Sequence, residues 1–530
     1  MERTGKITAY RLIVAVSLFL VLFDNVSFFR HVIGVYPISA QNIGFLISLF
    51  VGLTALIVLL FSLVASRYTT KPVLILTLLT SAIAAHFMDH YGIVIDHGMV
   101  KNVFQTNVNE ATDLLSLPLV LYFLIIGVLP AIGVYLAPVK YGTLKTALIA
   151  KLKVIAICLL ILVVAVLTFG RFYTSFIRVH KPLRFYTNPT YYIYSLGRYF
   201  EEQYSHPVTT VRPIGEDATI APTDKQRELV ILVVGEAARE DHFSLNGYQR
   251  DTNPRLAQRD VISFTNFYSS GTSTAASIPC MFSVYTRPDC TDRNEESTEN
   301  LLDVLRHAGV SVLWRDNNSS SKGVAVRVPY QDFRKPANNP VCDVECRDVG
   351  MLSGLQAYID GHRSGDIFIV LHQMGNHGPA YYKRYPPSFK RWSPVCTSNQ
   401  LNECSRQEII NAYDNAILYT DYFLSRVIDL LQKNSAHFET AMFYLSDHGE
   451  SLGEGGIYLH GLPYFLAPKA QKHIPAIMWF GRGFPVDRQA LEVKAGMPFS
   501  QDNLFHTVLG MLEIRTSVYD KKLDILNDGG

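Results

Sequence analysis

The hydrophobic positions of this chain are distributed in two different ways. Within the first 170 residues they form long apolar runs, and five of these reach the length needed to cross a bilayer. The five runs cover approximately residues 9–29, 43–65, 73–95, 117–137 and 154–170. Later in the chain the apolar runs are short and separated by polar stretches, as in the buried strands of a soluble domain. The pattern predicts a helical membrane domain over residues 1–170, followed by a water-facing domain.

Basic residues flank the five runs unevenly. One side of the predicted membrane carries Arg3, Lys6, Arg11, Arg67, Lys71, Lys140, Lys145, Lys151 and Lys153, whereas the loops on the other side carry only Arg30 and Lys101. Because cytoplasmic loops are enriched in Lys and Arg, we expect the N-terminus in the cytoplasm. Five crossings then place everything after residue 170 on the opposite side. The first run lacks a clear cleavage site, so we interpret it as an anchor.

The water-facing region alternates between predicted strands and helices. Strands are expected at residues 229–234, 310–314, 367–371, 441–445 and 476–480, with helices such as 299–307 and 409–431 between them. This alternation predicts a doubly wound α/β/α sandwich over residues 224–530. Residues 171–223 are rich in aromatic residues, Arg and Pro without a helix or strand period. We expect them to form an interfacial linker, since aromatic rings favour the head-group layer of a membrane.

Six of the seven cysteines lie in the water-facing region. They occur as three close pairs, Cys280/Cys290, Cys342/Cys346 and Cys396/Cys404. Three short local disulfides are the simplest pairing, and they imply an oxidising compartment. Zinc binding by cysteine is the competing interpretation, for which Cys342/Cys346 is the only tight spacing.

Acidic residues follow two of the predicted strands directly. Glu236 follows residues 229–234, and Asp447 and His448 follow residues 441–445. Ligands of open α/β sheets bind beyond the carboxyl ends of the strands, so these three side chains should meet in one crevice. Two carboxylates and an imidazole suit a zinc ion. A hydroxyl at such a metal becomes a nucleophile, and Thr274 lies in the hydroxyl-rich stretch 271–280.

Two further histidines follow predicted strands in the same way. The strand at residues 367–371 leads to His377, and His460 follows Asp447 and His448 along the chain. A single buried histidine is more often a satisfied core or loop residue than a ligand. Three histidines that converge with two carboxylates and a hydroxyl favour a functional site.

The net charge of +2 argues against nucleic acid as the main partner.

One polar segment, residues 98–111, lies between the third and fourth apolar runs and is too polar to cross a membrane. Two interpretations are open. The segment is a solvated loop, or it lies on the membrane surface under the soluble domain and offers Asn102, Gln105 and Glu110 to a lipid head group.

Seven motifs are distributed throughout the water-facing region: VVGEAAR (233–239), SLNGYQRDTNP (244–254), SSGTSTAASIPCMFS (269–283), RDNNSSSKG (315–323), HQMGNHGP (372–379), YLSDHGESLGE (444–454) and YLHGLPYFLAP (458–468). They resemble those of the phosphoethanolamine transferases of the Gram-negative inner membrane. The similarity is greatest to the lipid A enzymes, which include the mobile colistin-resistance proteins. The five-span anchor matches the family too. Glu240 departs from it, because a small residue is expected there; we expect Glu240 to face solvent.

The resemblance implies an alkaline-phosphatase/sulfatase-like catalytic domain. Glu236, Asp447 and His448 would hold a zinc ion, with Thr274 at its fourth position as the phosphorylated nucleophile. The three cysteine pairs would match the family's disulfides. The residues implied in handling phosphoethanolamine or its phosphate are Asn102, Glu110, Ser319, Lys322, His377 and His460, of which the two histidines could instead hold a second zinc.

The activity implied is transfer of phosphoethanolamine from phosphatidylethanolamine to a phosphate of lipid A. The family further implies an inner-membrane protein with a periplasmic catalytic domain, and we expect a monomer. Alternatives within the fold are transfer to an inner-core sugar of lipopolysaccharide, phosphoglycerol transfer and sulfatase activity. A sulfatase usually needs a modified cysteine or serine where Thr274 stands. An inactive lipid-binding or scaffold protein is the alternative outside enzymes, and the intact set of Glu236, Thr274, Asp447 and His448 argues against it.

Overall fold

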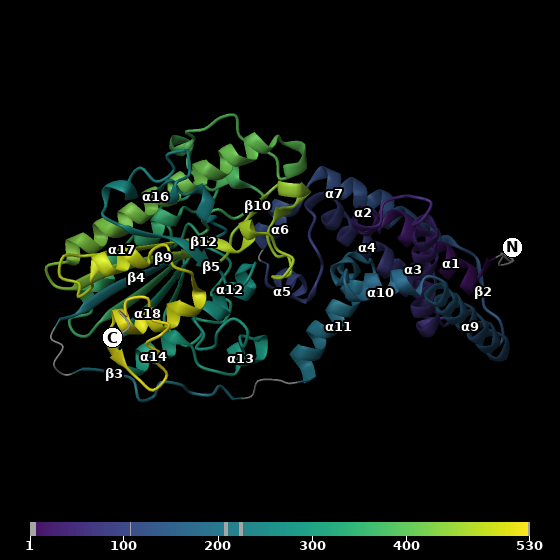
Figure 1. Cartoon of the computed structure of the whole chain (residues 1–530), viewed down its shortest axis with the longest axis horizontal. Coiled ribbons are helices and arrows are strands. Elements are labelled where there is room, and N and C mark those ends of the chain that lie inside the picture. Colours follow the sequence, from purple (N-terminus) through teal and green to yellow (C-terminus); the bar gives the residue numbers. More distant parts are fainter. Residues whose placement is uncertain (1–6, 107, 206–209, 222–225, 528–530) are drawn as a thin grey trace. The chain divides into compact units, whose positions relative to one another are not determined.

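The computed structural model describes residues 7–106, 108–205, 210–221 and 226–527. The chain divides into two compact units. The first, a helical unit, contains Met1–Val100 and Leu115–Glu201, and the second, a catalytic unit, contains Lys101–Leu114 and Glu202–Gly530. This division differs from the expected one, because residues 101–114 join the catalytic unit and residues 171–201 join the helices. Figure 1 shows the elements of both units.

The helical unit contains the predicted spans. Among the described residues, α3 (Ile43–Val64), α4 (Thr70–Tyr91), the run Leu117–Leu136 and α9 (Leu144–Thr168) are each long and apolar enough to cross a membrane. The run Leu117–Leu136 consists of α7 (Leu117–Tyr122), the π-helix Phe123–Val128 and α8 (Leu129–Leu136). A fifth span results if α1 (Ala9–Phe23) and α2 (Val26–Val35), which meet at an angle of 59°, count as one.

The break between α1 and α2 is a difference from the single span expected at residues 9–29. It occurs at Asp24 and Asn25, both buried. The Asn25 amide donates to the carbonyl of Leu20 at 2.9 Å and to that of Asn188 at 2.5 Å. A polar side chain that bonds backbone groups in this way offers an alternative to the helical hydrogen-bond ladder and so ends the helix.

The expected interfacial linker is largely helical. It contains α10 (Gly170–Arg178), a 3-10 turn (Lys181–Tyr186) and α11 (Thr190–Ser205). Its aromatic rings pack on the membrane helices: Phe172 stacks on Phe45 with centroids 5.0 Å apart, and the Tyr192 hydroxyl lies 2.7 Å from Thr80 Oγ1. The positions of these rings are set by the side chains of α3 and α4 that they contact. The rings therefore do not follow a helix or strand period in the sequence.

The catalytic unit is built on an eight-stranded sheet with the order β13-β5-β12-β9-β4-β8-β6-β7. The strands are β4 (Glu228–Gly235), β5 (Ile262–Tyr268), β6 (Ser311–Asp316), β7 (Tyr330–Asp332), β8 (Ile367–His372), β9 (Glu439–Ser446), β12 (His473–Phe480) and β13 (Phe499–Ser500). All five predicted strands are present. β4, β6, β7, β8 and β9 are parallel neighbours, whereas β12 is antiparallel to both β5 and β9.

Helices cover both faces of this sheet. Val230, Leu232 and Val234 of β4 point to one core, and Leu229, Ile231 and Val233 point to the other. The first core is completed by α12 (Thr274–Met281), α14 (Leu301–His307) and α18 (Leu504–Met511), and the second by α15 (Leu355–Gly361) and α16 (Arg406–Asn434). Figure 1 shows α16 on one side of the strands and α12, α14 and α18 on the other. Because both faces are buried, the strand appears in the sequence as an unbroken apolar run. The α/β/α layering is therefore confirmed.

The three local disulfides are also confirmed. Cys280–Cys290, Cys342–Cys346 and Cys396–Cys404 are bonded, and Cys158 in α9 is the remaining free cysteine. Since the paired sulfurs carry no thiolate, none of the six is available as a zinc ligand.

Candidate functional site

The site is assembled at the carboxyl ends of two neighbouring parallel strands. Gly235 at the end of β4 is in register with Ser446 at the end of β9, so Glu236 and Asp447 emerge side by side. The Asp447 amide donates to the carbonyl of Gly235 at 2.9 Å. The pairing of these strands therefore brings together two carboxylates that lie far apart in the sequence.

His448 and Thr274 complete the cluster. His448 Nε2 lies 3.4 Å from Glu236 Oε1 and 3.3 Å from Asp447 Oδ2. The Thr274 hydroxyl donates to Glu236 Oε2 at 3.1 Å and lies 3.4 Å from His448 Nε2. Glu236, Asp447 and His448 are fully buried, and each offers one ligand atom within 4.8 Å of the others. The four residues expected around a zinc ion are thus brought together.

The donor atoms of this cluster fit a zinc ion. Glu236 Oε1 and Asp447 Oδ2 are buried without a hydrogen-bond donor among the described residues, an arrangement that is unfavourable unless another positive group compensates it. His448 Nδ1 lies 2.8 Å from the carbonyl of Gly449, which suits an Nδ1–H donor and leaves Nε2 for a metal. Burial lowers the pKa of His448 to about 3, so the imidazole is neutral, as a ligand must be.

The turn that carries Glu236 is held by close backbone contacts. Ala237 has a φ of 52°, its amide donates to Asp447 Oδ1 at 3.1 Å, and its carbonyl accepts from the Tyr413 hydroxyl at 2.7 Å. Gly375 packs against the same turn, where a Cβ atom would lie 3.0 Å from the amide and carbonyl of Glu236. A residue larger than glycine at position 375 would therefore push on the backbone of a candidate ligand.

Asn318 is a site residue that sequence reasoning missed. Its side-chain amide donates to Glu236 Oε2 and to the carbonyl of Gln373, both at 2.7 Å. It follows β6 just as Glu236 follows β4, inside the motif RDNNSSSKG. The signal in the sequence is a polar side chain just after the end of a strand. The family resemblance pointed to the neighbouring Ser319 and Lys322 instead.

Thr274 is the first residue of α12, as expected for a phosphate-binding position. Ser273 is the N-cap, with an extended backbone (φ −153°). The free N–H groups of a helix start and the helix dipole both favour a bound anion. Gly271 allows the loop to turn tightly onto the helix, because a Cβ there would lie 2.7 Å from Ala276 Cβ and 2.9 Å from the Ser277 amide nitrogen.

The two further histidines lie beside the cluster. The ring centroids of His448 and His460 are 4.2 Å apart, and those of His460 and His377 are 5.8 Å apart. Glu450, a buried residue not assigned from the sequence, accepts from His460 Nδ1 at 3.1 Å. Burial alone would lower the pKa of His460, but the Glu450 carboxylate raises it to about 9. Burial lowers the pKa of His377 to about 4.

The residues expected to contact phosphoethanolamine lie on two segments. Ser319 is buried in the loop after β6, and Lys322 in the same loop has a φ of 48°. Lys322 Nζ lies 3.4 Å from the carbonyl of Gln105 in α5 (His97–Gln105), the helix that carries Asn102. Positive φ angles outside glycine are concentrated at functional sites. The side chain of Glu110 lies outside the described residues.

Glu240 does not face solvent as expected. It is buried, and its Oε2 lies 3.1 Å from His473 Nδ1 in β12. The imidazole gives this buried carboxyl group a partner within hydrogen-bond distance.

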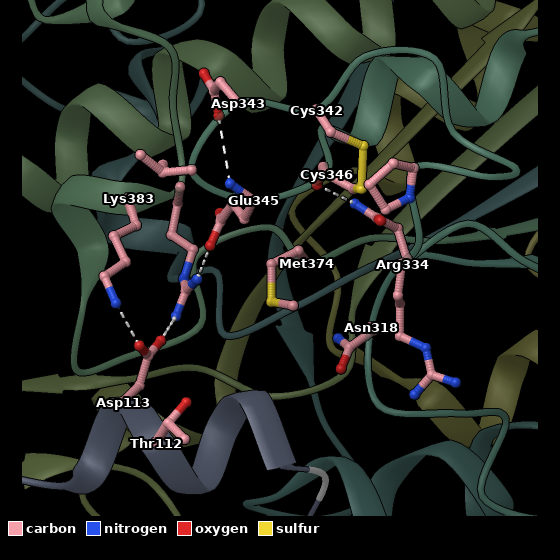
Figure 2. Close-up of a pocket in the computed structure, with 14 residues that line it drawn as sticks. Thr112, Asp113, Asn318, Arg334, Cys342, Asp343, Glu345, Cys346, Met374 and Lys383 are labelled. Carbon is pink, nitrogen blue, oxygen red and sulfur yellow. Dashed lines mark hydrogen bonds and ion pairs between the residues drawn. A yellow bond between two sulfur atoms is a disulfide. The ribbon is translucent and has the colours of Figure 1, made fainter.

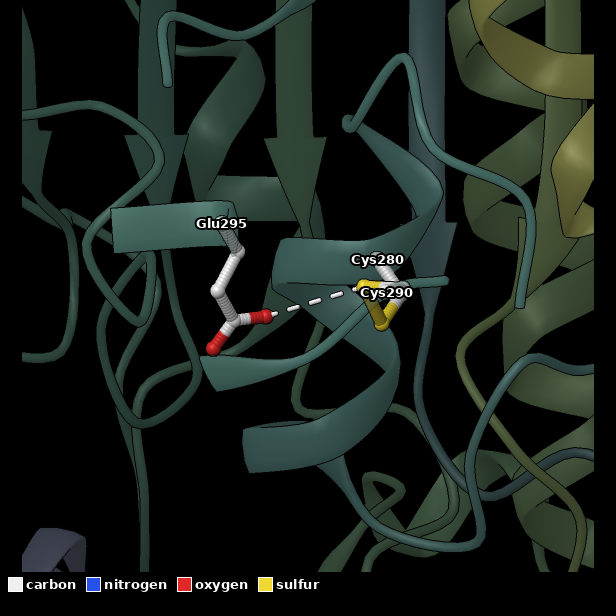
Figure 3. A group of neighbouring side chains, drawn as sticks. All are labelled: Cys280, Cys290 and Glu295. Atoms are coloured by element: carbon white, nitrogen blue, oxygen red, sulfur yellow. Dashed lines mark hydrogen bonds between the residues drawn. A yellow bond between two sulfur atoms is a disulfide. The ribbon is translucent and has the colours of Figure 1, made fainter. Parts of the chain in front are cut away.

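A second group of candidate metal ligands, Cys280, Cys290 and Glu295, is not a metal site. Figure 3 shows the two cysteines joined by a disulfide, with Glu295 Oε2 3.9 Å from Cys290 Sγ. Without a thiolate, the group retains only the carboxyl group of Glu295 as a ligand.

Comparisons with known proteins match this architecture over its whole length. Residues 228–514 match the Sulfatase family model, and residues 53–204 match the model described as Phosphoethanolamine transferase EptA/EptB. The chain is 44% identical over 486 residues to the phosphatidylethanolamine transferase Mcr-2 of Escherichia coli, covering 89% of this chain and 90% of that protein. It is 39% identical over 522 residues to the phosphoethanolamine transferase EptA of Salmonella typhimurium, covering 96% and 95%.

A solved structure is similar to the entire chain. The integral membrane lipooligosaccharide phosphoethanolamine transferase A (EptA) from Neisseria meningitidis superposes with a TM-score of 0.94 at 34% identity and covers 98% of both chains. The expected fold, a helical membrane domain joined to an alkaline-phosphatase-like domain, is therefore confirmed.

Proposed function

This chain belongs to the phosphoethanolamine transferases, and we propose that it transfers phosphoethanolamine from phosphatidylethanolamine to a phosphate group of lipid A. The proposed nucleophile is Thr274, which holds phosphoethanolamine as an ester between two half-reactions. The observation that carries this proposal is the position of Thr274 Oγ1, 3.1 Å from Glu236 Oε2 and 3.4 Å from His448 Nε2 at the start of α12.

The named activities of the relatives support the donor and the class of acceptor. A protein 44% identical to this chain is named a phosphatidylethanolamine transferase, which supports that lipid as donor. The similar full-length structure is described as a lipooligosaccharide phosphoethanolamine transferase, which supports an acceptor of the lipid A type. Because both substrates are membrane lipids, a catalytic domain attached to several membrane helices suits the reaction.

In the first half-reaction, Thr274 Oγ1 attacks the phosphorus of phosphatidylethanolamine and a new O–P bond forms. The bond from phosphorus to the diacylglycerol oxygen breaks, and diacylglycerol leaves with a proton. Glu236 Oε2 accepts the hydrogen bond of the Thr274 hydroxyl and so orients its oxygen for an in-line attack. The α12 amides stabilise the negative phosphoryl group.

In the second half-reaction, an oxygen of a lipid A phosphate attacks the same phosphorus. The bond to Thr274 Oγ1 breaks, and the hydroxyl regains a proton. His377 and His460 border the cluster and are proposed to bind the phosphate oxygens or to hold a second zinc. Asn102, Glu110, Ser319 and Lys322 are proposed to bind the rest of the head group.

Glu236, Asp447 and His448 are the proposed zinc ligands, with Thr274 at the fourth position. A bound zinc would lower the pKa of the Thr274 hydroxyl and offset the charge of the phosphoryl transition state. The unpartnered oxygens of Glu236 and Asp447 support this assignment.

We propose that the protein is a monomer of the inner membrane with its catalytic domain in the periplasm. Three disulfides support an oxidising compartment. The excess of Lys and Arg on the N-terminal side of the spans supports the same orientation.

Mass spectrometry of lipid A from cells with and without the protein tests the proposed function. The expected result is phosphoethanolamine on a lipid A phosphate, and its absence when Thr274→Ala is expressed at the same level. Phosphoethanolamine on a core sugar alone, or phosphoglycerol in its place, would contradict the proposed substrates.

A further inference from the structure

One segment between two membrane helices belongs to the catalytic unit. Lys101–Leu114, here called the docking segment, contains most of α5 and all of α6 (Val108–Leu114). In sequence it lies between α4 and α7, both of the helical unit. The segment also carries Asn102, a proposed head-group ligand. What holds this segment against the catalytic domain therefore bears on the reaction.

The N-terminal end of the docking segment is held by a buried ion pair. Lys101 Nζ lies 2.8 Å from Asp292 Oδ1 and 2.9 Å from Glu295 Oε1. The side chain of Lys101 is 10% exposed and that of Glu295 is 8% exposed. Burial alone would lower the pKa of Lys101, but the carboxylates of Glu295 and Asp292 outweigh it and raise the pKa above its usual range. The lysine is thus held in a buried position by two acidic side chains.

The acidic partners of Lys101 are connected through a disulfide to the helix that begins at Thr274. Asp292 and Glu295 lie on α13 (Asp292–Glu296), which begins two residues after Cys290. Cys290 is bonded to Cys280 in α12, and α12 begins at Thr274 (Figure 3). Lys101, Gln105, Lys322 and Pro279 of α12 are among the residues that line one cavity of about 430 Å³.

The C-terminal end of the segment is held by a second set of ion pairs. Asp113 of α6 pairs with Lys383 and lies 2.9 Å from a terminal nitrogen of Arg384. The Arg384 side chain is 3% exposed; it also pairs with Glu345, and its Nε donates to the carbonyl of His377 at 2.7 Å. Figure 2 shows Asp113, Lys383 and Glu345 around a cavity of about 330 Å³. Asp113 is thus linked through the Arg384 side chain to the backbone of His377, which lies beside the reacting centre.

The other two disulfide loops support this second contact. Glu345 lies inside the loop closed by Cys342–Cys346, and Asn399 lies inside the loop closed by Cys396–Cys404. The Asn399 amide donates to the carbonyl of Asp113. Each of the three disulfides therefore closes a loop that contains, or lies next to, a side chain of this network: Asp292, Glu345 and Asn399.

We propose that Lys101 and Asp113 are positioning residues that hold the docking segment against both sides of the reacting centre, Lys101 toward the helix of Thr274 and Asp113 toward the loop of His377. The inference deepens the proposed function and rests on it for its effect on the donor lipid. A solvated loop, the other interpretation of this segment, would not bury a lysine between two carboxylates.

The experiment uses the full-length protein in micelles that contain phosphatidylethanolamine, with two independent readouts. Hydrogen exchange of the amides at 101–106 and 111–114 reports docking and does not depend on activity. Steady-state kinetics with the donor lipid reports its consequence for the reaction. The variants are Lys101→Met, Lys101→Arg and Asp113→Asn. The matched control is Lys335→Met, because Lys335 is a 72% exposed lysine whose ion pair is with Asp332, at 3.7 Å.

Both Lys101→Met and Asp113→Asn are expected to speed exchange in the docking segment about tenfold or more, since one partner of a buried ion pair is lost. Lys101→Met should raise KM for the donor about tenfold with kcat within about twofold of wild type. Asp113→Asn should also lower kcat, because Arg384 holds the His377 carbonyl. Lys101→Arg should restore most of the docking, and Lys335→Met should change neither readout.

Unchanged exchange in both variants would overturn the docking role. Faster exchange with an unchanged KM for the donor would overturn the positioning role. If the wild-type protein does not consume phosphatidylethanolamine, the proposed function fails, while the exchange measurement still decides whether the two ion pairs hold the segment. A loss of zinc content or of overall thermal stability in Lys101→Met would assign the lysine a general structural role and contradict the proposal.

Discussion

The hydroxyl of Thr274 donates a hydrogen bond of 3.1 Å to Oε2 of Glu236, 38 residues earlier in the chain. The same oxygen accepts from Asn318 at 2.7 Å, whereas the other carboxylate oxygen, Oε1, has no hydrogen-bond donor among the described residues. Glu236 therefore has two distinct tasks. One oxygen orients the proposed nucleophile, and the other is left for the proposed metal.

Substitutions at Thr274 should separate the nucleophile from the metal site. We expect Thr274→Ala to reduce transfer by about a thousandfold or more, because no hydroxyl remains to accept the phosphoryl group. Thr274→Ser should retain measurable activity, since only a methyl group is lost. Ser273→Ala should be milder than Thr274→Ala, because the Ser273 side chain makes no capping hydrogen bond to α12. Transfer assays with zinc content measured in parallel check this: zinc should stay near wild type in Thr274→Ala.

Asn318 should affect the metal through Glu236. We expect Asn318→Ala to weaken zinc binding by about 10–100-fold, the range for partners that orient a metal ligand. Asn338→Ala is the matched control, because Asn338 is exposed and its side-chain amide donates to the carbonyl of Asp332. Zinc titration against a competing chelator measures both. Equal affinities in the two variants would mean that Asn318 has no orienting role.

Removal of zinc should destabilise the catalytic domain as well as stop the reaction. Without a cation, the buried Glu236 and Asp447 carboxylates lack compensation. A ligand present at a thousandfold excess over its Kd stabilises the folded state by about 4 kcal/mol, so chelation should lower Tm by several degrees. Addition of zinc should restore both Tm and activity. A metal-free protein, verified by elemental analysis, with unchanged Tm and activity would refute the assignment.

The contribution of Asp113 to the docking of α6 should be insensitive to pH in the physiological range. Burial opposes ionisation of Asp113, but Arg384 and Lys383 outweigh it and lower its pKa, while Glu345 lies across Arg384. A carboxyl whose pKa is lower in the docked state stabilises docking above its undocked pKa, and this stabilisation is lost as pH falls through the docked value. The contribution of Asp113 to docking should therefore be constant from about pH 5 to 8 and be lost only below about pH 4.

The mobility of a spin label at Ala111→Cys, an exposed position of α6, measures this docking in a protein that carries Cys158→Ala. In Asp113→Asn the label should be mobile at every pH. A transition of the wild-type label near pH 6 or 7 would show that Asp113 does not control docking.

The strands were predictable where burial on both faces produces an unbroken apolar run. All eight residues of β4 and of β12 are buried, and both runs were recognised. Their directions were not, because a continuous apolar run is the same for a parallel and an antiparallel strand. β5 does not stand out because polar residues that are half-buried or exposed interrupt its apolar positions, and β7 does not because it is a short polar strand at the edge of the sheet.

The candidate site was predictable only in part for a similar reason. Glu236 and Asp447 follow recognisable strands, so their meeting could be inferred from the sheet. Arg384 and Asp113 are 271 residues apart, and neither follows a predicted strand. Their partnership depends on how the docking segment packs within the catalytic unit, for which the local sequence carries no signal.

The central claim is that Thr274 carries phosphoethanolamine, and intact mass tests it most directly. The purified full-length protein is incubated with phosphatidylethanolamine in the absence of an acceptor, and the product is analysed whole and after digestion. We expect one phosphoethanolamine per chain, located on Thr274, and no adduct in Thr274→Ala. An adduct on Ser273, or full turnover by Thr274→Ala, would contradict the account.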